Sequence, residues 1–268
     1  MLISANLGML FTDLPLLSAV RAAASAGFDA IEVHFPYAVP AGDLRAVLTQ
    51  VGVPLVSLNT APGDLAAGEF GLAAVPGRAA AARAAVDQAV AYAAVVGARA
   101  VHVMAGKAQG AAAGAAFAET LAYACDAVPA GMDVLIEPIN PFDVPGYFLG
   151  GLDQAARVLD DLGRDNLRIL FDCYHVARIH GDVAGAFAAH RDRIGHVQFA
   201  AVPDRGEPDR GDIDYARLLP ALGWDGAFGA EYRPRSGNTG AGLAWMAGLR
   251  AAFSADAITY RQGRADPV

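Results

Sequence analysis

Short runs of hydrophobic and β-branched residues alternate along the chain with longer alanine-rich stretches whose apolar positions recur every three or four residues. The short runs are typical of buried strands, and the longer stretches are typical of helices that bury one face. The pattern predicts strands at Leu2–Asn6, Ala30–His34, Leu55–Asn59, Ala100–Met104, Val134–Glu137, Arg168–Asp172, His196–Phe199 and Phe228–Tyr232. It predicts helices at Leu14–Ala26, Ala41–Gln50, Gly77–Val96, Ala113–Ala127, Leu152–Leu162, Val176–Ala189, Tyr215–Leu222 and Gly240–Phe253.

This regular alternation predicts an α/β protein with a single (β/α)8 TIM barrel. A doubly wound sheet is the alternative, but "ANLGML" after the first strand lacks the glycine spacing of a dinucleotide-binding loop. No Pro/Gly/Ser-rich linker divides the chain. We therefore expect one barrel domain over residues 1–253, followed by a polar C-terminal tail over residues 254–268.

Composition and charge narrow the classes of protein to consider. The net charge of −8 argues against a nucleic-acid-binding protein, which usually has a basic face. We find no apolar run of the roughly 18 residues that a membrane span needs, and no secretory leader. The two cysteines, Cys125 and Cys173, provide no disulfide framework. We expect a cytoplasmic protein without a membrane partner.

Lysine usage singles out one position. Of the 20 basic residues, 19 are arginine, and Lys107 is the single lysine. Codon bias accounts for the excess of arginine, but it does not account for the one lysine that is kept. Because a compact ammonium differs chemically from a planar guanidinium, Lys107 is a candidate for a specific contact.

Polar side chains occupy the ends of four successive predicted strands. These are Glu137, Asp172, Gln198 and Glu231. Active sites of TIM barrels lie at the carboxyl ends of the strands, so these four side chains are expected to meet. A single strand-end acid would ordinarily be a solvated residue. Four oxygen-bearing side chains on consecutive strands instead indicate a shared site.

A divalent cation would hold these acids together. Hard oxygen ligands favour Mg²⁺ or Mn²⁺, although ligand type alone leaves zinc open. A cation would also compensate the cost of burying Glu137, which ends the apolar run "VLI".

Other polar residues near these strand ends have two interpretations each. His175, three residues after Asp172, either overhangs the same site or bonds to the backbone at a helix start. The loop "DRGEPDRGDID" over residues 204–214 is either a lid, with Arg205 reaching an anionic substrate, or an ordinary exposed loop. His102, within an apolar strand, is interpreted as a satisfied core histidine, and Cys173 as a small core residue.

The segments "SANLGMLF", "FPY", "PGR", "LIEPINPFDVPGYFL", "FDCYHVAR", "IGHVQFA", "RGEPDRGDIDY" and "EYRP" resemble the hydroxypyruvate isomerase family, including its 2-oxo-tetronate isomerase branch. The resemblance extends from Leu2 to about Leu249. It implies a xylose-isomerase-like barrel. It also implies that Glu137 and Glu231 are the acid/base pair, and that Glu137, Asp172, Gln198 and Glu231 hold the metal.

Two positions refine the resemblance. Related sugar 3-epimerases have a histidine where this chain has Gln198, which favours the isomerases. Members of the family have polar residues in the stretch after this glutamine, where the present chain reads "QFAAVPDRGEP". Ala201, Val202 and Asp204 therefore depart from the family pattern in a segment expected to face the substrate.

An isomerase of this kind moves a proton between adjacent carbons through an enediolate, which two glutamates and a metal would support. We expect a small anionic hydroxy-keto acid as substrate, either hydroxypyruvate or a 2-oxo-tetronate, with Lys107, His175 and Arg205 holding its carboxylate. The alternatives are a ketose 3-epimerase, a metal-dependent phosphodiesterase, for which six histidines are few, and an inactive sugar-acid binding protein. Homo-oligomerisation is left open.

Overall fold

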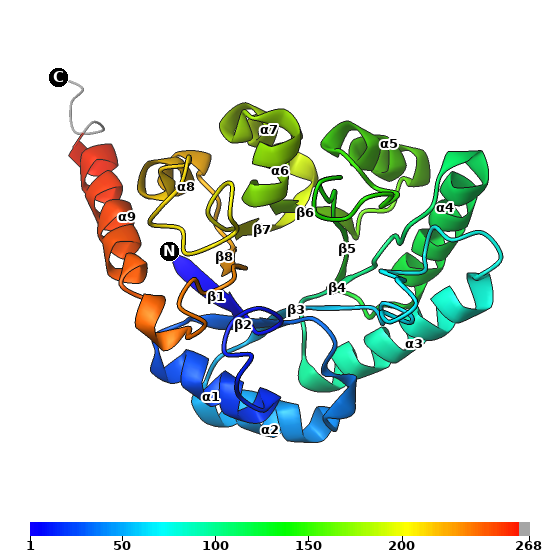
Figure 1. The fold of residues 1–268 in the computed structure, drawn as a ribbon, viewed down its shortest axis with the longest axis horizontal. Helices are drawn as coiled ribbons and strands as arrows, with labels where there is room; N and C mark the ends of the chain where they lie inside the picture. Colours follow the sequence, from blue (N-terminus) through cyan, green and yellow to red (C-terminus); the bar gives the residue numbers. More distant parts are fainter. Residues whose placement is uncertain (263–268) are drawn as a thin grey trace.

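The structure is a computed structural model, and residues 1–262 are described. Within these residues, eight parallel strands close into a barrel in chain order, each strand pairing with its sequence neighbours and β8 with β1 (Figure 1). The strands are β1 (Leu2–Asn6), β2 (Ala30–Val33), β3 (Leu55–Asn59), β4 (Ala100–His102), β5 (Asp133–Ile136), β6 (Leu167–Asp172), β7 (Ile194–Phe199) and β8 (Ala227–Ala230). The predicted (β/α)8 barrel is confirmed.

Helices surround the barrel and connect its strands (Figure 1). They are α1 (Leu16–Ser25), α2 (Ala41–Val51), α3 (Ala79–Val96), α4 (Gly110–Ala127), α5 (Leu152–Leu162), α6 (Cys173–His180), α7 (Val183–His190), α8 (Tyr215–Leu222) and α9 (Trp245–Gln262). Short 3-10 turns lie at η1 (Pro36–Ala38), η2 (Arg191–Arg193) and η3 (Gly240–Gly242). Left-handed glycines end four of the helices, at Gly52, Gly97, Gly163 and Gly223.

Two predicted helices differ from those observed. The single helix expected over Val176–Ala189 is wrong, because the chain forms α6 and α7 with a break at Gly181 and Asp182. Gly181 has φ 80°, and the side chain of Asp182 accepts from Gly185 N to begin α7. The last helix, α9, continues across the expected end of the barrel domain to Gln262. Residues 263–268 of the predicted tail lie outside the described residues.

The expectation that no segment is long and apolar enough to span a membrane is wrong for helix α3. By length and composition alone, its 18 residues pass that test. Alanine gives α3 this hydropathy, and the helix contains Arg83 and Asp87. In the structure α3 packs against β3, β4 and the neighbouring helices, as a helix of the barrel wall does.

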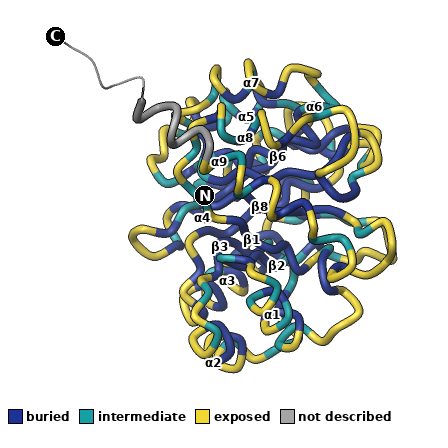
Figure 2. The backbone as a smooth tube through the Cα atoms, turned by 90° about the vertical axis from the view of Figure 1, so that its left-hand side faces the viewer, coloured by how far each residue is buried: buried dark blue, intermediate teal, exposed yellow. Residues whose placement is uncertain are grey.

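Apolar side chains fill the space between the strands and the helices, and the strands are the most deeply buried part of the molecule (Figure 2). Inside the barrel, small apolar layers are formed by Ala30, Val56 and Ala227 and by Ala100, Leu135 and Leu170. Toward the carboxyl ends of the strands the interior becomes polar. Side chains alternate along a strand, so the residue two positions after each interior apolar residue also points into the barrel. It lies closer to the carboxyl end of its strand.

Candidate active site

A cavity of about 630 Å³ opens at the carboxyl ends of the strands. The first half of the barrel contributes His34, Asn59 and His102 to its lining, and the second half contributes Glu137 and Glu231. Loops after β3, β4 and β5 form one side of the cavity, where an isolated bridge pairs Lys107 with Tyr147. Of the four predicted strand-end residues, Glu137 and Glu231 line this cavity, whereas Asp172 and Gln198 are not among its lining residues.

Glu137 directly follows β5 and is buried at the base of the cavity. Its Oε1 lies 3.7 Å from Nε2 of His175, and its Oε2 lies 3.9 Å from Nδ1 of His102. Within residues 1–262, Oε1 has no hydrogen-bond partner. Burial, followed by the nearby charges of Glu231 and Asp172, raises the pKa of Glu137 well above its ordinary value.

Asp172 ends β6 and is fully enclosed. Its Oδ1 accepts from Tyr174 N at 2.9 Å and so caps α6, while Oδ2 lies 3.3 Å from Nη2 of Arg205 and 3.6 Å from Nε2 of His175. Burial raises the pKa of Asp172 to about 7, although Arg205 opposes that shift. This carboxyl therefore titrates close to neutral pH in the metal-free protein.

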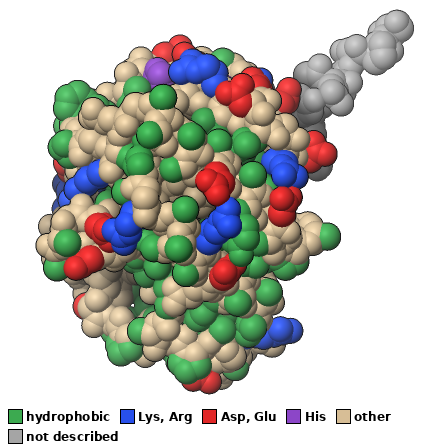
Figure 3. Space-filling model, turned by 90° about the vertical axis from the view of Figure 1, so that its right-hand side faces the viewer, with side chains coloured by type: hydrophobic (Ala, Val, Ile, Leu, Met, Phe, Trp, Pro, Cys, Tyr) green, Lys and Arg blue, Asp and Glu red, His purple; other side chains and the backbone are tan. Residues whose placement is uncertain are grey.

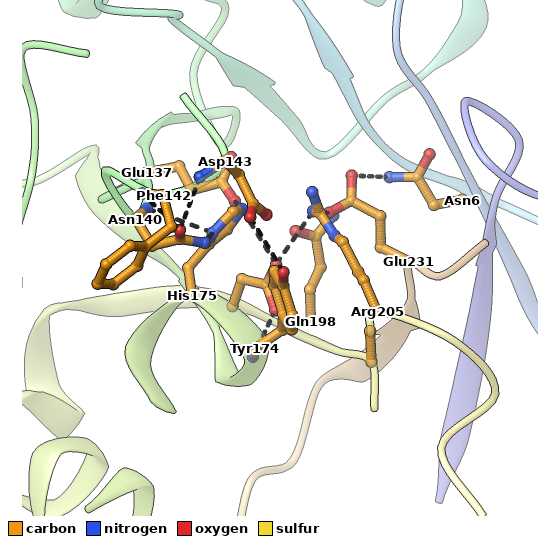
Figure 4. A network of polar contacts seen from close by, with 12 residues as sticks. Asn6, Glu137, Asn140, Phe142, Asp143, Tyr174, His175, Gln198, Arg205 and Glu231 are labelled. Atoms are coloured by element: carbon orange, nitrogen blue, oxygen red, sulfur yellow. Dashed lines mark hydrogen bonds and ion pairs between the residues drawn. The ribbon is translucent and has the colours of Figure 1, made fainter. Parts of the chain in front are cut away.

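Glu231 follows β8 and, unlike Glu137, is well supplied with donors. Oε1 accepts from Nδ2 of Asn6 and lies 2.9 Å from Nε2 of His34, while Oε2 accepts from Nη2 of Arg205 at 2.6 Å (Figure 4). Although burial raises the pKa of Glu231, Arg205 and then His34 outweigh burial and lower it to about 2. The pKa values of the two glutamates are therefore shifted in opposite directions.

The position of His34 depends on Gly8. A Cβ at position 8 would overlap the imidazole ring of His34, so the glycine leaves the ring its space. Asn6 is fixed in the same turn, because its Oδ1 accepts from Gly8 N at 2.9 Å. Its Nδ2 is consequently the atom that faces Glu231.

Arg205 projects between the acids from the loop after β7 (Figure 4). Its side chain is 12% exposed, its guanidinium lies 5.0 Å over the ring of Tyr174, and its backbone is left-handed, with φ 55°. The backbone oxygen of Arg205 accepts from Arg233 N at 2.8 Å. Although burial acts against the charge, Glu231 and then Asp172 raise the pKa of Arg205. Arg205 is therefore a fixed cation of the site.

His175 combines the two interpretations left open by the sequence, because it lies beside Glu137 and Asp172 and its Nδ1 also accepts from the backbone nitrogen of Asn140. Its Nδ1 lies 2.7 Å from Nδ2 of Asn140, and Nε2 faces the two carboxyls. Burial, and then Arg205, lower the pKa of His175 to about 3, so the imidazole is neutral. Ligand atoms of Glu137, Asp172 and His175 all lie within 4.8 Å of one another.

This triad fits a divalent cation. Three observations support the fit: the carboxylate and imidazole donors converge, Oε1 of Glu137 lacks a partner, and Oε1 of Gln198 is likewise buried without one among the described residues. Buried oxygens of this kind normally meet a donor or a cation. Gln198 points its Nε2 at Glu32, and that pair is buried inside the barrel below the cavity.

Lys107 and Arg233 lie at the cavity rim rather than among the acids. Nζ of Lys107 donates to the backbone oxygen of Gly68 at 2.9 Å. The side chain of Arg233 lines the cavity and makes no ion pair with the described acidic residues. Elsewhere on the surface basic and acidic side chains intermingle, as on the face in Figure 3.

The loop over residues 204–214 is held by Arg235, which follows β8. Arg235 donates to both carboxyl oxygens of Asp204, and through its backbone and side chain to the buried Glu207. These contacts fix the segment from which Arg205 extends. Ala201 and Val202, which depart from the family pattern, are buried and are not among the cavity-lining residues.

Several site residues were missed from the sequence. The interpretation of His102 as a satisfied core histidine is wrong: it lines the cavity, its Nε2 has no partner in the part of the chain described, and burial lowers its pKa to about 4. Asn6 and His34 lie at the ends of the first two strands, so the criterion that identified the acids would also have identified them. Glu32, inside a strand, carries no such signal. Cys173 is a buried core residue, as expected.

Known proteins resemble this chain over most of its length. A family model described as a xylose isomerase-like TIM barrel matches residues 20–249. The chain is 46% identical to a 2-oxo-tetronate isomerase of Cupriavidus necator over 251 residues, which are 91% of this chain and 96% of that protein. It is 38% identical to a hydroxypyruvate isomerase of Escherichia coli over 91% of this chain and 97% of that protein.

Solved structures show the same architecture. A crystal structure from Brucella melitensis, titled an AP endonuclease of family 2, superposes with a TM-score of 0.88 at 38% identity, covering 92% of this chain and 98% of that chain. An L-ribulose 3-epimerase superposes with a TM-score of 0.81 at 20% identity, covering 100% of both chains, and supports the fold alone.

Proposed function

The chain belongs to the xylose isomerase-like TIM barrel family, among its hydroxypyruvate and 2-oxo-tetronate isomerases, and on this premise we propose that it interconverts a small hydroxy-keto acid with its positional isomer. The chain is an isomerase. The specific reactions proposed are hydroxypyruvate to 2-hydroxy-3-oxopropanoate, or 2-oxo-tetronate to 3-oxo-tetronate.

The observation that carries this proposal is the unequal state of Glu137 and Glu231 at one cavity. Against the effect of burial, Arg205 and then His34 lower the pKa of Glu231 to about 2, whereas burial and then Glu231 raise the pKa of Glu137. One carboxylate that accepts a proton and one that delivers a proton are what an isomerisation through an enediolate requires. The two residues follow β5 and β8, so they approach the cavity from different strands.

The reaction moves one proton between two carbons and one between two oxygens, and it needs no external reductant or oxidant. A glutamate removes the proton from the carbon that bears the hydroxyl group, and the electron pair forms an enediolate across this carbon and the neighbouring carbonyl carbon. A proton is then delivered to the former carbonyl carbon, and the hydroxyl proton passes to the other oxygen. Cationic Arg205 lies where it can donate to an enediolate oxygen.

Glu137, Asp172, Gln198 and Glu231 are the proposed metal ligands, with His175 close to the first two. When bound, Mg²⁺ or Mn²⁺ would supply the positive charge that polarises the two substrate oxygens. The donor set of carboxylate and amide oxygens suits these hard cations.

We propose that the substrate carboxylate is held by cations at the cavity. Lys107 and Arg233 contribute from the rim, and Arg205 contributes from among the acids. The net charge of −8 and the buried acids repel an anion, so local cations must offset that field.

The proposal is tested with a panel of substrates followed by ¹H NMR in D₂O. The metal-loaded protein should convert hydroxypyruvate or a 2-oxo-tetronate and incorporate deuterium at the new C–H bond. Conversion of fructose or tagatose with inversion at C3, and of neither acid, would instead make it a ketose 3-epimerase. The Glu137→Gln variant serves as the inactive control.

A further inference from the structure

Glu32 is an acid buried inside the barrel that none of the steps above uses. It is 1% exposed and comes from β2, beneath the floor of the cavity. Oε1 of Glu32 accepts a hydrogen bond from Oγ of Ser4 at 2.5 Å. It also lies 3.0 Å from Nε2 of His196, but this second contact is not aligned as a hydrogen bond. Oε2 accepts from Nε2 of Gln198 at 2.6 Å. Both carboxyl oxygens are thus occupied.

This contact decides which end of the Gln198 amide faces which way. A carboxylate only accepts hydrogen bonds, whereas a glutamine amide has a donor end and an acceptor end. With Nε2 on Glu32, Oε1 of Gln198 is turned away from that carboxylate, and it is buried without a hydrogen-bond partner within residues 1–262. An orphaned oxygen of this kind is costly unless it meets a donor or a cation.

The backbone on the neighbouring strand keeps the pair in place. Gly229 of β8 lies opposite Gln198 in the register between β7 and β8. A Cβ at Gly229 would overlap Oε1 of Glu32 and approach Cγ of Gln198 to 2.8 Å. The absence of a side chain at this position therefore leaves room for the contact between Glu32 and Gln198.

We propose that Glu32 is a positioning residue: it fixes the amide of Gln198 so that the oxygen, not the nitrogen, is presented to the divalent cation. This rests on the proposed function, in which Gln198 is a metal ligand. An amide turned the other way would direct N–H donors at the cation and could not bind it. Partners that orient a metal ligand typically change metal affinity by about 10- to 100-fold when removed.

The first test is made on the metal-free protein and does not depend on metal binding. In Glu32→Gln, which conserves volume, the new amide can donate to Oε1 of Gln198 and allow the flipped orientation. Hydrogen exchange of the Gln198 side-chain ¹⁵N amide, assigned by its loss in Gln198→Met, should become at least about tenfold faster than in the wild type. Unchanged exchange would overturn the proposal. Thr120→Val, another buried polar change, is the matched control.

The second test is the Mn²⁺ dissociation constant, measured by calorimetry. Glu32→Gln should weaken binding at least about tenfold, and it should cause no further loss in a Gln198→Met background, because its effect passes through Gln198. Equal losses in both backgrounds, or wild-type affinity in Glu32→Gln, would refute the proposal.

Two further results are interpretable. If Glu32→Gln does not fold, Ser4→Ala is used in its place, because it removes one hydrogen-bond donor to Glu32. The exchange rate of the Gln198 amide and the Mn²⁺ dissociation constant should then each increase by about threefold. No change in either quantity would count against Glu32. If the wild-type protein binds no Mn²⁺, the metal part of the proposed function fails, and the amide exchange measurement alone decides the role of Glu32.

Discussion

Nη2 of Arg205 donates to Oε2 of Glu231 at 2.6 Å, at the cavity in which we propose that the substrate carboxylate binds. In that proposal the guanidinium of Arg205 is shared between Glu231 and the carboxylate of the substrate. While Arg205 contacts Glu231, it lowers the pKa of that carboxyl and makes it a weaker base. A substrate carboxylate that draws the guanidinium toward itself would strengthen the base at the moment when a proton has to be removed.

The first prediction concerns Arg205→Met. Arg205 is the main cause that lowers the pKa of Glu231, so the variant should raise that pKa and activity should be lost at a higher pH than in the wild type. The measurement is the acidic limb of kcat/KM against pH. It should move into the range above about pH 4, the ordinary region for a glutamate, while Arg205→Lys restores part of the wild-type profile. An unchanged profile in Arg205→Met would contradict this role.

The second prediction concerns the two glutamates. Glu137→Gln and Glu231→Gln should each lower kcat by at least about a hundredfold, because each removes a proton-transfer group while keeping its size. Circular dichroism and thermal melting check that both variants fold. Glu119→Gln, an exposed residue paired with Arg83, is the control and should keep wild-type turnover. Activity within tenfold of the wild type in either site variant would remove that residue from the proposed pair.

The third prediction concerns metal removal. Exhaustive chelation should abolish most of the activity, and Mg²⁺ or Mn²⁺ should restore it, because the triad of Glu137, Asp172 and His175 fits a divalent cation. Metal content is verified by elemental analysis before each assay. Full turnover by a preparation shown to be metal-free would dispose of the metal assignment.

The fourth prediction links metal binding to pH. The pKa of Asp172 is raised to about 7 in the metal-free protein, so below this pH the carboxyl must lose a proton before it binds a cation. Mn²⁺ affinity should therefore rise at least about tenfold per pH unit up to about pH 7. Calorimetry in buffers of different ionisation enthalpy should show net proton release at pH 6. Affinity that is constant between pH 6 and 8 would argue that the acids are already ionised.

The fifth prediction concerns substrate charge. Lys107→Met and Arg233→Met should each lower kcat/KM on hydroxypyruvate about ten- to a hundredfold, the usual loss for one charge-assisted contact. Activity on an uncharged ketose should change little. Arg210→Met, on the loop after β7 and outside the cavity lining, is the matched control. Equal losses on charged and uncharged substrates would show that the rim residues have a structural role instead.

The barrel was accessible from the sequence because each strand is a short apolar run and each helix is bounded by polar or glycine-rich segments. The acids Glu137, Asp172 and Glu231 were accessible because they end strands, and strand ends meet at one rim of a TIM barrel. The break between α6 and α7 was missed because Ala177 to Ala189 keeps a helical pattern across Gly181, and the Asp182 cap was read as part of the helix.

The contacts of the site were not accessible in the same way. The link from Glu32 to Gln198 depends on the stagger of β2 and β7 across the barrel interior, which sequence spacing does not encode. The placement of Arg205 depends on a left-handed residue and on contacts from the loop after β8, both of which are long-range features. Both examples involve residues more than 25 positions from their partners, where local pattern carries no information.

The two halves of the barrel contribute different kinds of side chain to the cavity. The proposed acid/base pair comes from the second half, whereas strand ends in the first half supply the polar groups of Asn59, His34 and His102. The loops of the first half supply much of the apolar wall, such as Leu65 and Phe70. In the proposed function, the loops of the first half thus shape the wall that the substrate meets without contributing either proton-transfer glutamate. Descendants of such a barrel can acquire a longer or differently branched substrate by exchanging loops of the first half while inheriting the proton-transfer chemistry intact.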